Sequence, residues 1–237
     1  MHPRALLIDA MGTLVRLQDP VTALADELRE RFGVSVDADQ AGAALAAEVA
    51  FYRDHLHEGT DRARLAELRA RCAAVLFAAL PDFSELDAVA PEARTATLLA
   101  LLRFAAFSDA RAALGRAREA GARVVVVSNW DVSLAEVLDR VGLAAAVDGV
   151  VTSAGVGAAK PDPAIFAAAL ELAGTRPEEC VHVGDSPAED VAGARAAGIE
   201  PVLLRRTGPG RPDGVRTIAS LDELRWPMGS RAVSSAG

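Results

Sequence analysis

Residues 5–14 read ALLIDAMGTL, an apolar run that stops at Asp9 and continues into Gly12 and Thr13. A short run without polar residues is typical of a strand buried on both faces of a parallel sheet. Open α/β sheets form their ligand sites outside the carboxyl ends of such strands. The pattern therefore predicts a central first strand that delivers Asp9 to that edge, although an aspartate at an ordinary strand-to-turn junction gives the same local pattern.

From residue 107 onward, apolar strand patterns alternate with single helical patterns. This alternation indicates a parallel sheet with helices on both faces. We therefore expect an α/β fold with a Rossmann-like, doubly wound sheet. The expected strands are 122–127, 149–152, 180–183 and 201–204, and the expected helices are 109–119, 132–141, 163–172 and 187–197.

Between the first and second strands the spacing of apolar residues is helical. Four helices are expected there, whereas a βαβ crossover needs only one, so the pattern predicts an inserted helical cap domain. The expected helices are 20–32, 37–57, 63–80 and 91–104. The last residues are small and polar, as in a disordered tail. The predicted division is a core at 1–15 and 93–227, a cap at 16–92 and a tail at 228–237.

Composition excludes several classes of partner. The formal net charge is −8 and basic residues are not clustered, which argues against a nucleic-acid surface. No run approaches the roughly 20 apolar residues that a membrane span needs, and the start of the chain lacks the pattern of a signal peptide. Cys72 and Cys180 lie far apart in apolar stretches, as free thiols do in a reducing compartment. We expect a cytoplasmic protein without membrane or nucleic-acid partners, and the sequence leaves its oligomeric state open.

Reactive side chains follow four of the expected strands. Lys160 is the only lysine among 25 basic residues, and its compact ammonium is a group that the planar fork of arginine does not imitate. Carboxylates gathered at one sheet edge repel each other unless a cation joins them, and their hard oxygen atoms suit Mg²⁺. Because parallel strands end at the same edge, one crevice is expected to hold Asp9, Ser128, Asn129, Lys160, Asp185 and Asp190.

Four segments resemble the four motifs of the haloacid dehalogenase-like hydrolase superfamily. They are DAMGT at 9–13, Ser128-Asn129, KPDP at 160–163, and GDS at 184–186 with Asp190. The segments occur in the family's order on the expected elements, and the helical insertion lies where helical-cap members of the family carry theirs. The chain is therefore identified as a member of this superfamily with a first motif that departs from the usual pattern.

The resemblance implies a hydrolase that acts on a phosphorylated small molecule through an aspartyl-phosphate on Asp9. It implies that Mg²⁺ is held by Asp9, the backbone carbonyl of Met11 and Asp185, with Asp190 as a further ligand or as an acceptor behind the ligands. Lys160 would lie over the nucleophile and the phosphate as a point charge. The implied phosphate- and substrate-binding residues are Gly12, Thr13, Ser128, Asn129 and Lys160.

Met11 is the departure that matters for function. Phosphatases of the family have a second aspartate there, which protonates the leaving alcohol and then activates water, a contribution of roughly 10²–10⁴-fold. The 2-haloacid dehalogenases of the family also lack that aspartate, because halide leaves without a proton, yet they use no metal and typically carry serine where this chain has Asp185. Three functions stay open: a Mg²⁺-dependent phosphatase, which we favour, a haloacid dehalogenase, and an impaired member that binds a phosphate ligand or a protein.

The sequence does not identify the group that replaces the missing acid. His55 and His57 lie in the predicted cap and titrate near neutral pH, so that either is a candidate acid or base, and we include His55 among the substrate-binding candidates. Asp131, two residues beyond Asn129, is another candidate. Charged side chains on such a helix are also commonly solvated without any role in catalysis. The substrate itself is not fixed by any of these patterns.

Overall fold

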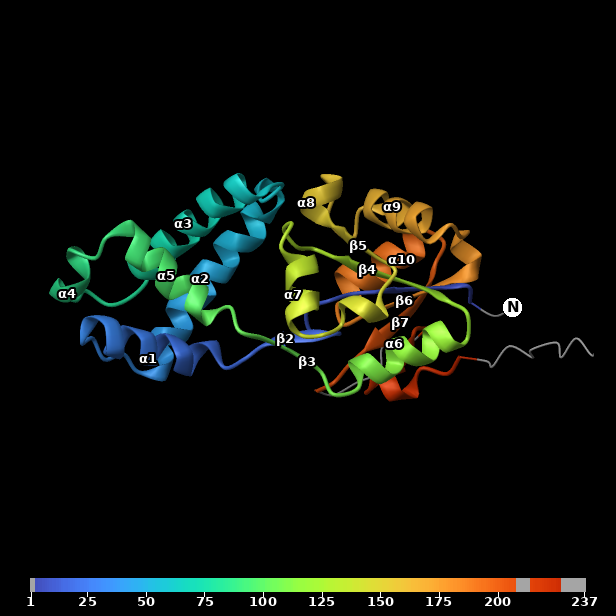
Figure 1. Cartoon of the computed structure of the whole chain (residues 1–237), viewed down its shortest axis with the longest axis horizontal. Coiled ribbons are helices and arrows are strands. Elements are labelled where there is room, and N and C mark those ends of the chain that lie inside the picture. The colour runs from blue at the N-terminus through green and yellow to red at the C-terminus, as the bar shows by residue number, and fades with distance from the viewer. Residues whose placement is uncertain (1–2, 208–213, 227–237) are drawn as a thin grey trace, which may run out of the picture.

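The central sheet is parallel throughout and carries β1 in its middle (Figure 1). The computed structural model describes residues 3–207 and 214–226, and within them this sheet has six strands in the order β5-β4-β1-β6-β7-β8. Every residue of β1 (Ala5–Ile8) is fully buried, as its apolar sequence predicts. Its neighbours are β4 (Arg123–Ser128) and β6 (Cys180–Gly184), and the outer strands are β5 (Gly149–Thr152), β7 (Glu200–Leu204) and β8 (Arg216–Ile218).

Helices cover both faces of this sheet. Leu6 and Ile8 of β1 share a hydrophobic cluster with Leu114 of α6, whereas Leu7 points to the opposite face and shares a cluster with Phe166 of α9. The prediction of a Rossmann-like, doubly wound sheet is therefore confirmed. The helices and turns of this core are α6 (Ala110–Glu119), α7 (Leu134–Arg140), η2 (Ala144–Ala146), α8 (Ser153–Val156), α9 (Pro163–Ala173), η3 (Pro177–Glu179), α10 (Ala192–Ala196) and η5 (Leu221–Glu223).

A second group of helices, which we call the helical unit, has a hydrophobic core of its own (Figure 1). Leu24, Leu28 and Leu68 are fully buried within it. Asp37 and Gln40 form a capping box at the start of its second helix, as polar residues at this spacing do. The helical unit comprises α1 (Pro20–Phe32), α2 (Ala38–His55), η1 (Leu56–Glu58), α3 (Arg62–Ala78), α4 (Ser84–Asp87) and α5 (Pro91–Leu101).

Helix α5 belongs to the helical unit, because Leu98 and Leu101 are buried in the hydrophobic core of that unit. The boundary predicted at residue 92 cuts through α5, and the structure places the end of the helical unit at the end of this helix. The sequence alone continues the helix to Phe104. Strand pairing, which the helical spacing of the apolar residues does not reveal, ends it earlier.

The helical unit is connected to the core through two short antiparallel strands, β2 (Val15–Leu17) and β3 (Phe104–Ala106). Leu17 pairs with Phe104, so the chain leaves the core and returns to it at adjacent points. The sequence analysis did not predict this pair. Three residues per strand are too few to show an alternating pattern.

The turn after β6 also differs from the prediction, which placed a regular helix at 187–197. It forms a π-helical turn, η4 (Pro187–Val191), in which the Val191 N–H donates to the Ser186 carbonyl oxygen at 3.2 Å, before α10 begins. The wider turn directs Asp190 towards the sheet edge. Strand β8 was not predicted, and the predicted tail at 228–237 lies outside the described residues.

Across residues 3–207 and 214–226, no helix has both the length and the apolar composition needed to cross a lipid bilayer.

Candidate active site

Asp9 lies directly beyond β1 and is 5% exposed. Its Oδ1 atom accepts hydrogen bonds from Ser128 Oγ at 2.9 Å and from Lys160 Nζ at 2.6 Å. Asp9 and Ser128 lie at the ends of β1 and β4, and Lys160 lies in the loop between α8 and α9. The fold brings these three residues together, as the sequence predicts. Burial raises the pKa of Asp9 above its usual range, and the positive charge of Lys160 opposes this effect.

Lys160 is enclosed between two carboxylates. Its Nζ atom lies 2.6 Å from Asp9 Oδ1 and 2.6 Å from Asp190 Oδ1, and its side chain is 1% exposed. Burial alone would lower the pKa of Lys160, but the two carboxylates prevail and raise it. The lysine is therefore a fixed positive charge, in agreement with its being the single lysine of the chain.

Asn129 positions the backbone of Lys160. Its Oδ1 accepts from the Lys160 N–H at 2.7 Å, and its Nδ2 donates to the Lys160 carbonyl oxygen at 3.0 Å and to Glu189 Oε2 at 3.1 Å. The Asn129 side chain thus ties the Lys160 loop to the end of β4. Its backbone N–H stays a candidate phosphate donor.

Asp190 has both of its oxygen atoms engaged. Oδ1 is shared between Lys160 and His182 Nε2 at 2.9 Å, and Oδ2 accepts from the Ser186 N–H at 3.0 Å. Burial alone would raise the pKa of Asp190, but the contacts with His182 and Lys160 hold it well below its usual range. These bonds suit an anchor for the lysine better than a direct metal ligand.

The sequence analysis missed His182, which is fully buried in β6. The only signal is one histidine in an otherwise apolar strand, and such a residue often has a purely structural role. Its hydrogen bond to Asp190 depends on the π-helical turn, which the sequence pattern did not predict.

Asp185 lies on the open side of the site beside Gly12. Gly12 has a φ of +77°, and a Cβ added to it would lie 2.1 Å from Asp185 Oδ2. Glycine is therefore required here on two grounds, its left-handed backbone and the close approach of the carboxylate. Partial desolvation and then the charges of Asp9 and Asp190 raise the pKa of Asp185 to about 6.

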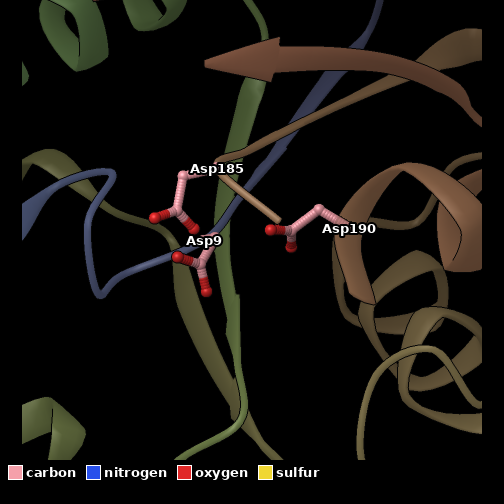
Figure 2. Close-up of side chains that lie close together, drawn as sticks. All are labelled: Asp9, Asp185 and Asp190. Atoms are coloured by element: carbon pink, nitrogen blue, oxygen red, sulfur yellow. The ribbon is translucent and has the colours of Figure 1, made fainter. Parts of the chain in front are cut away.

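Asp9, Asp185 and Asp190 together offer oxygen atoms that all lie within 4.8 Å of one another (Figure 2). Figure 2 shows the carboxylates of Asp9 and Asp185 side by side, with Asp190 pointing towards them from the side of α10. Lys160 contacts only two of these three carboxylates, those of Asp9 and Asp190, so the cluster carries an excess of negative charge. Hard oxygen donors with uncompensated charge fit Mg²⁺.

Other predicted residues make contacts elsewhere. Thr13 is fully buried and its hydroxyl has no hydrogen-bond partner among the described residues, so its side chain is not presented to a ligand. His55 Nδ1 donates a 2.8 Å hydrogen bond to the Phe51 carbonyl oxygen, and its ring stacks on the Phe51 ring. His57 is exposed in η1. In the described part of the chain, no hydrogen bond joins either histidine to the carboxylate cluster.

Asp131 links the core to the helical unit. Its Oδ2 accepts from the Tyr52 hydroxyl at 2.8 Å, and its Oδ1 accepts from the Ser133 N–H at 2.7 Å. Next to it, the Val132 N–H donates to the Gly59 carbonyl oxygen at 3.1 Å. Asp131 is 3% exposed, and its two oxygen atoms are already used in these contacts.

Comparison with known proteins decides the family. The model of the family described as "Hydrolase: haloacid dehalogenase-like hydrolase" matches residues 3–198. The chain belongs to the haloacid dehalogenase-like hydrolases. The resemblance of the four motifs is therefore confirmed, and so is the prediction that the protein is a hydrolase.

Two curated relatives of this hydrolase match part of its length. It is 43% identical over 100 residues to haloacid dehalogenase-like hydrolase domain-containing protein 3 of Bos taurus, which covers 42% of this chain and 40% of that protein. It is 40% identical over 105 residues to phosphoserine phosphatase of Thermus thermophilus, which covers 44% of this chain and 42% of that protein. The hydrolase thus spans about two fifths of the length of these relatives.

A solved structure matches the hydrolase over nearly its full length. The HAD phosphatase from Thermococcus onnurineus superposes with a TM-score of 0.63 at 25% identity, covering 94% of this chain and 96% of that chain. The helical unit and the sheet are therefore both included in the likeness.

Proposed function

We propose that this hydrolase is a Mg²⁺-dependent phosphatase that acts on a phosphorylated small molecule, with Asp9 as the nucleophile. The observation that carries the proposal is the arrangement around Asp9: its Oδ1 is held by Ser128 and Lys160, and the carboxylate of Asp185 lies beside it. The names of the Thermus thermophilus and Thermococcus onnurineus proteins support a phosphatase.

Asp9 presents its second oxygen atom to the site. Oδ1 accepts two hydrogen bonds, whereas Oδ2 accepts none from the described residues. In the proposed reaction Oδ2 attacks phosphorus, and the new Oδ2–P bond forms as the bond from phosphorus to the leaving oxygen breaks. Water then attacks the phosphorus of the aspartyl-phosphate, which releases inorganic phosphate and restores the carboxylate.

The neighbouring groups hold the charges of this reaction. Lys160 supplies a positive charge to the nucleophile and to the incoming phosphoryl group, and Ser128 with the Asn129 N–H donates to phosphoryl oxygens. Mg²⁺ held by Asp9, Asp185 and the Met11 carbonyl would reduce the repulsion between carboxylates and phosphate when it is bound. Asp190 keeps Lys160 in place.

The helical unit is proposed to act as the cap of the site and to select the substrate. It reaches the core at Asp131 and Val132, three and four residues beyond Ser128. A substrate bound at Ser128 would therefore lie close to this junction. The cap's shape, more than any single motif, would determine which phosphorylated compound fits.

Met11→Asp is expected to accelerate the hydrolysis of alkyl phosphates by about 10²-fold. The rate of acetyl phosphate hydrolysis should change little. An alkoxide needs a proton in order to leave, whereas acetate leaves without help. Met11 is 39% exposed, so a carboxyl group fits there without moving the backbone carbonyl. The measurement compares kcat/KM for glycerol phosphate and acetyl phosphate in both proteins. Met11→Asn is the control of equal size, and an equal gain in that variant would mean that the effect is not proton transfer.

Asp185→Ala is expected to raise the Mg²⁺ concentration needed for half-maximal activity by roughly tenfold or more, because a hard-cation site loses one of its anionic ligands. Activity is measured during Mg²⁺ titration, and EDTA should abolish it in the wild type. Asp26→Ala, at an aspartate of α1 whose side chain is 46% exposed, is the control and should leave the titration unchanged. Full wild-type activity in EDTA would contradict the proposed metal.

A haloacid dehalogenase is the second candidate, and Met11 is the observation that favours it, because halide leaves without a proton. The metal-suited pair of Asp9 and Asp185 argues against it. A panel of aryl phosphate, acetyl phosphate and chloroacetate, run with Mg²⁺ and with EDTA, separates the two. Halide release that persists in EDTA would establish the dehalogenase, and Mg²⁺ binding without turnover of any compound would indicate an impaired member.

A further inference from the structure

Arg206, two residues beyond β7, binds the loop that follows Asp9. Its Nε donates to the Gly12 carbonyl oxygen at 3.3 Å, and its Nη2 donates to the Thr13 carbonyl oxygen at 2.8 Å. The same guanidinium forms a two-pronged pair with Asp109, at 2.9 Å from Nη1 to Oδ2 and 2.8 Å from Nη2 to Oδ1. One side chain therefore joins three segments that are distant in sequence.

Asp109 is itself held from several directions. Its Oδ2 also accepts from Ser220 Oγ at 2.7 Å and from the Leu221 N–H at 2.9 Å. Burial alone would raise the pKa of Asp109, but the hydrogen bonds from Arg206 and Ser220 prevail and lower it to about 2. The carboxylate is a fixed, charged anchor, so the position of the guanidinium is fixed as well.

The Phe107 ring packs against the guanidinium group of Arg206. The Arg206 guanidinium carbon lies 3.8 Å from the centre of this ring, and the Phe107 N–H donates to the Leu14 carbonyl oxygen at 2.9 Å. Phe107 directly follows β3. Arg206 is thus packed where the connection to the helical unit meets the loop after β1.

We propose that Arg206 is a positioning residue that holds the loop of residues 11–13 against Asp185 and thereby sets the affinity of the site for Mg²⁺. The inference rests on the proposed function. The peptide group that carries the Met11 carbonyl adjoins Gly12, whose own carbonyl Arg206 binds, and Gly12 has almost no space beside Asp185. Release of the Gly12 and Thr13 carbonyls frees this loop to turn, which moves the Met11 carbonyl relative to the carboxylates.

The test is Mg²⁺ binding by isothermal titration calorimetry, without substrate, in the wild type, Arg206→Ala and Arg206→Lys. Arg206→Ala is expected to raise the Mg²⁺ dissociation constant by roughly 10- to 100-fold. Arg206→Lys keeps the charge and the aliphatic stem, but one ammonium group cannot replace the fork, so it is expected to behave like the alanine variant. It also preserves the test if the alanine variant does not fold.

Arg16→Ala is the matched control, because Arg16 lies over the same Phe107 ring at 5.6 Å and makes no hydrogen bond to the Gly12 or Thr13 carbonyls in the described structure. It should leave Mg²⁺ affinity unchanged. A folded Arg206 variant that binds Mg²⁺ within about twofold of the wild type would overturn the inference while leaving the proposed function intact.

The mobility of the loop is tested independently of Mg²⁺ binding by the amide hydrogen-exchange rates of residues 9–17, measured without metal. Faster exchange in the Arg206 variants than in Arg16→Ala is the expected result, and unchanged exchange would overturn the positioning role. If the wild type takes up no Mg²⁺, the proposed metal and the effect of Arg206 on it both fail.

Discussion

Replacement of Asp9 by asparagine is expected to abolish turnover while leaving the protein folded. A carboxamide has nearly the shape of a carboxylate, and its oxygen still accepts hydrogen bonds from Ser128 and Lys160. It is nevertheless a very poor nucleophile, so kcat should fall by roughly 10⁴-fold or more. The comparison is kcat on an aryl phosphate, with a good leaving group so that the missing acid at position 11 does not limit the rate.

Thermal melting followed by circular dichroism supplies the control for Asp9→Asn. The melting temperature should stay near that of the wild type, and Asp26→Asn should retain both fold and activity. Wild-type turnover by a correctly folded Asp9→Asn protein would show that Asp9 is not the nucleophile.

Lys160→Arg is expected to be nearly as damaging as Lys160→Ala, although arginine keeps the positive charge. Nζ lies 2.6 Å from carboxylates of both Asp9 and Asp190 in a space that is almost closed to solvent. The larger guanidinium needs coplanar acceptors and would displace Asp9. A misplacement of about 1 Å at a nucleophile costs roughly 10²-fold in rate, and we expect at least that loss in kcat.

Lys160→Ala should also reduce stability. It leaves two buried carboxylates without their shared cation, and removal of one partner from a buried ion pair costs about 3–5 kcal/mol. Urea unfolding measures this difference, with Arg123→Ala as a control that removes an exposed charge at the start of β4. A Lys160→Arg protein with wild-type kcat would mean that the single lysine reflects composition alone.

The sequence predicted the sheet and the meeting of Asp9, Ser128 and Lys160 because both depend on local patterns. An apolar run marks each central strand, and the topology of parallel strands then brings their carboxyl ends together. No side-chain contact had to be known in advance. The four motifs added the order in which the reactive residues occur.

The side-chain pairs that the sequence did not predict join residues that are far apart in the chain. Arg206 binds Asp109 across 97 residues, and Tyr52 binds Asp131 across 79. No local pattern links the partners of either pair, and only the folded chain brings them together. Asp131 illustrates the limit: its position near Asn129 suggested acid–base chemistry, whereas its oxygen atoms are bonded to Tyr52 and Ser133.

The antiparallel pair of β2 and β3 resembles the two strands of a β-hairpin. The helical unit takes the place of the hairpin's loop. Beyond the Leu17–Phe104 pair, the Gln18 N–H donates to the Arg103 carbonyl oxygen at 2.8 Å, so the two ends of the insertion remain one strand spacing apart. Any segment whose ends fit this spacing, from a tight turn to a whole domain, closes the hairpin without disturbing β1. The helices between β2 and β3 are therefore replaceable by another segment while Asp9 and Ser128 keep their places at the ends of β1 and β4.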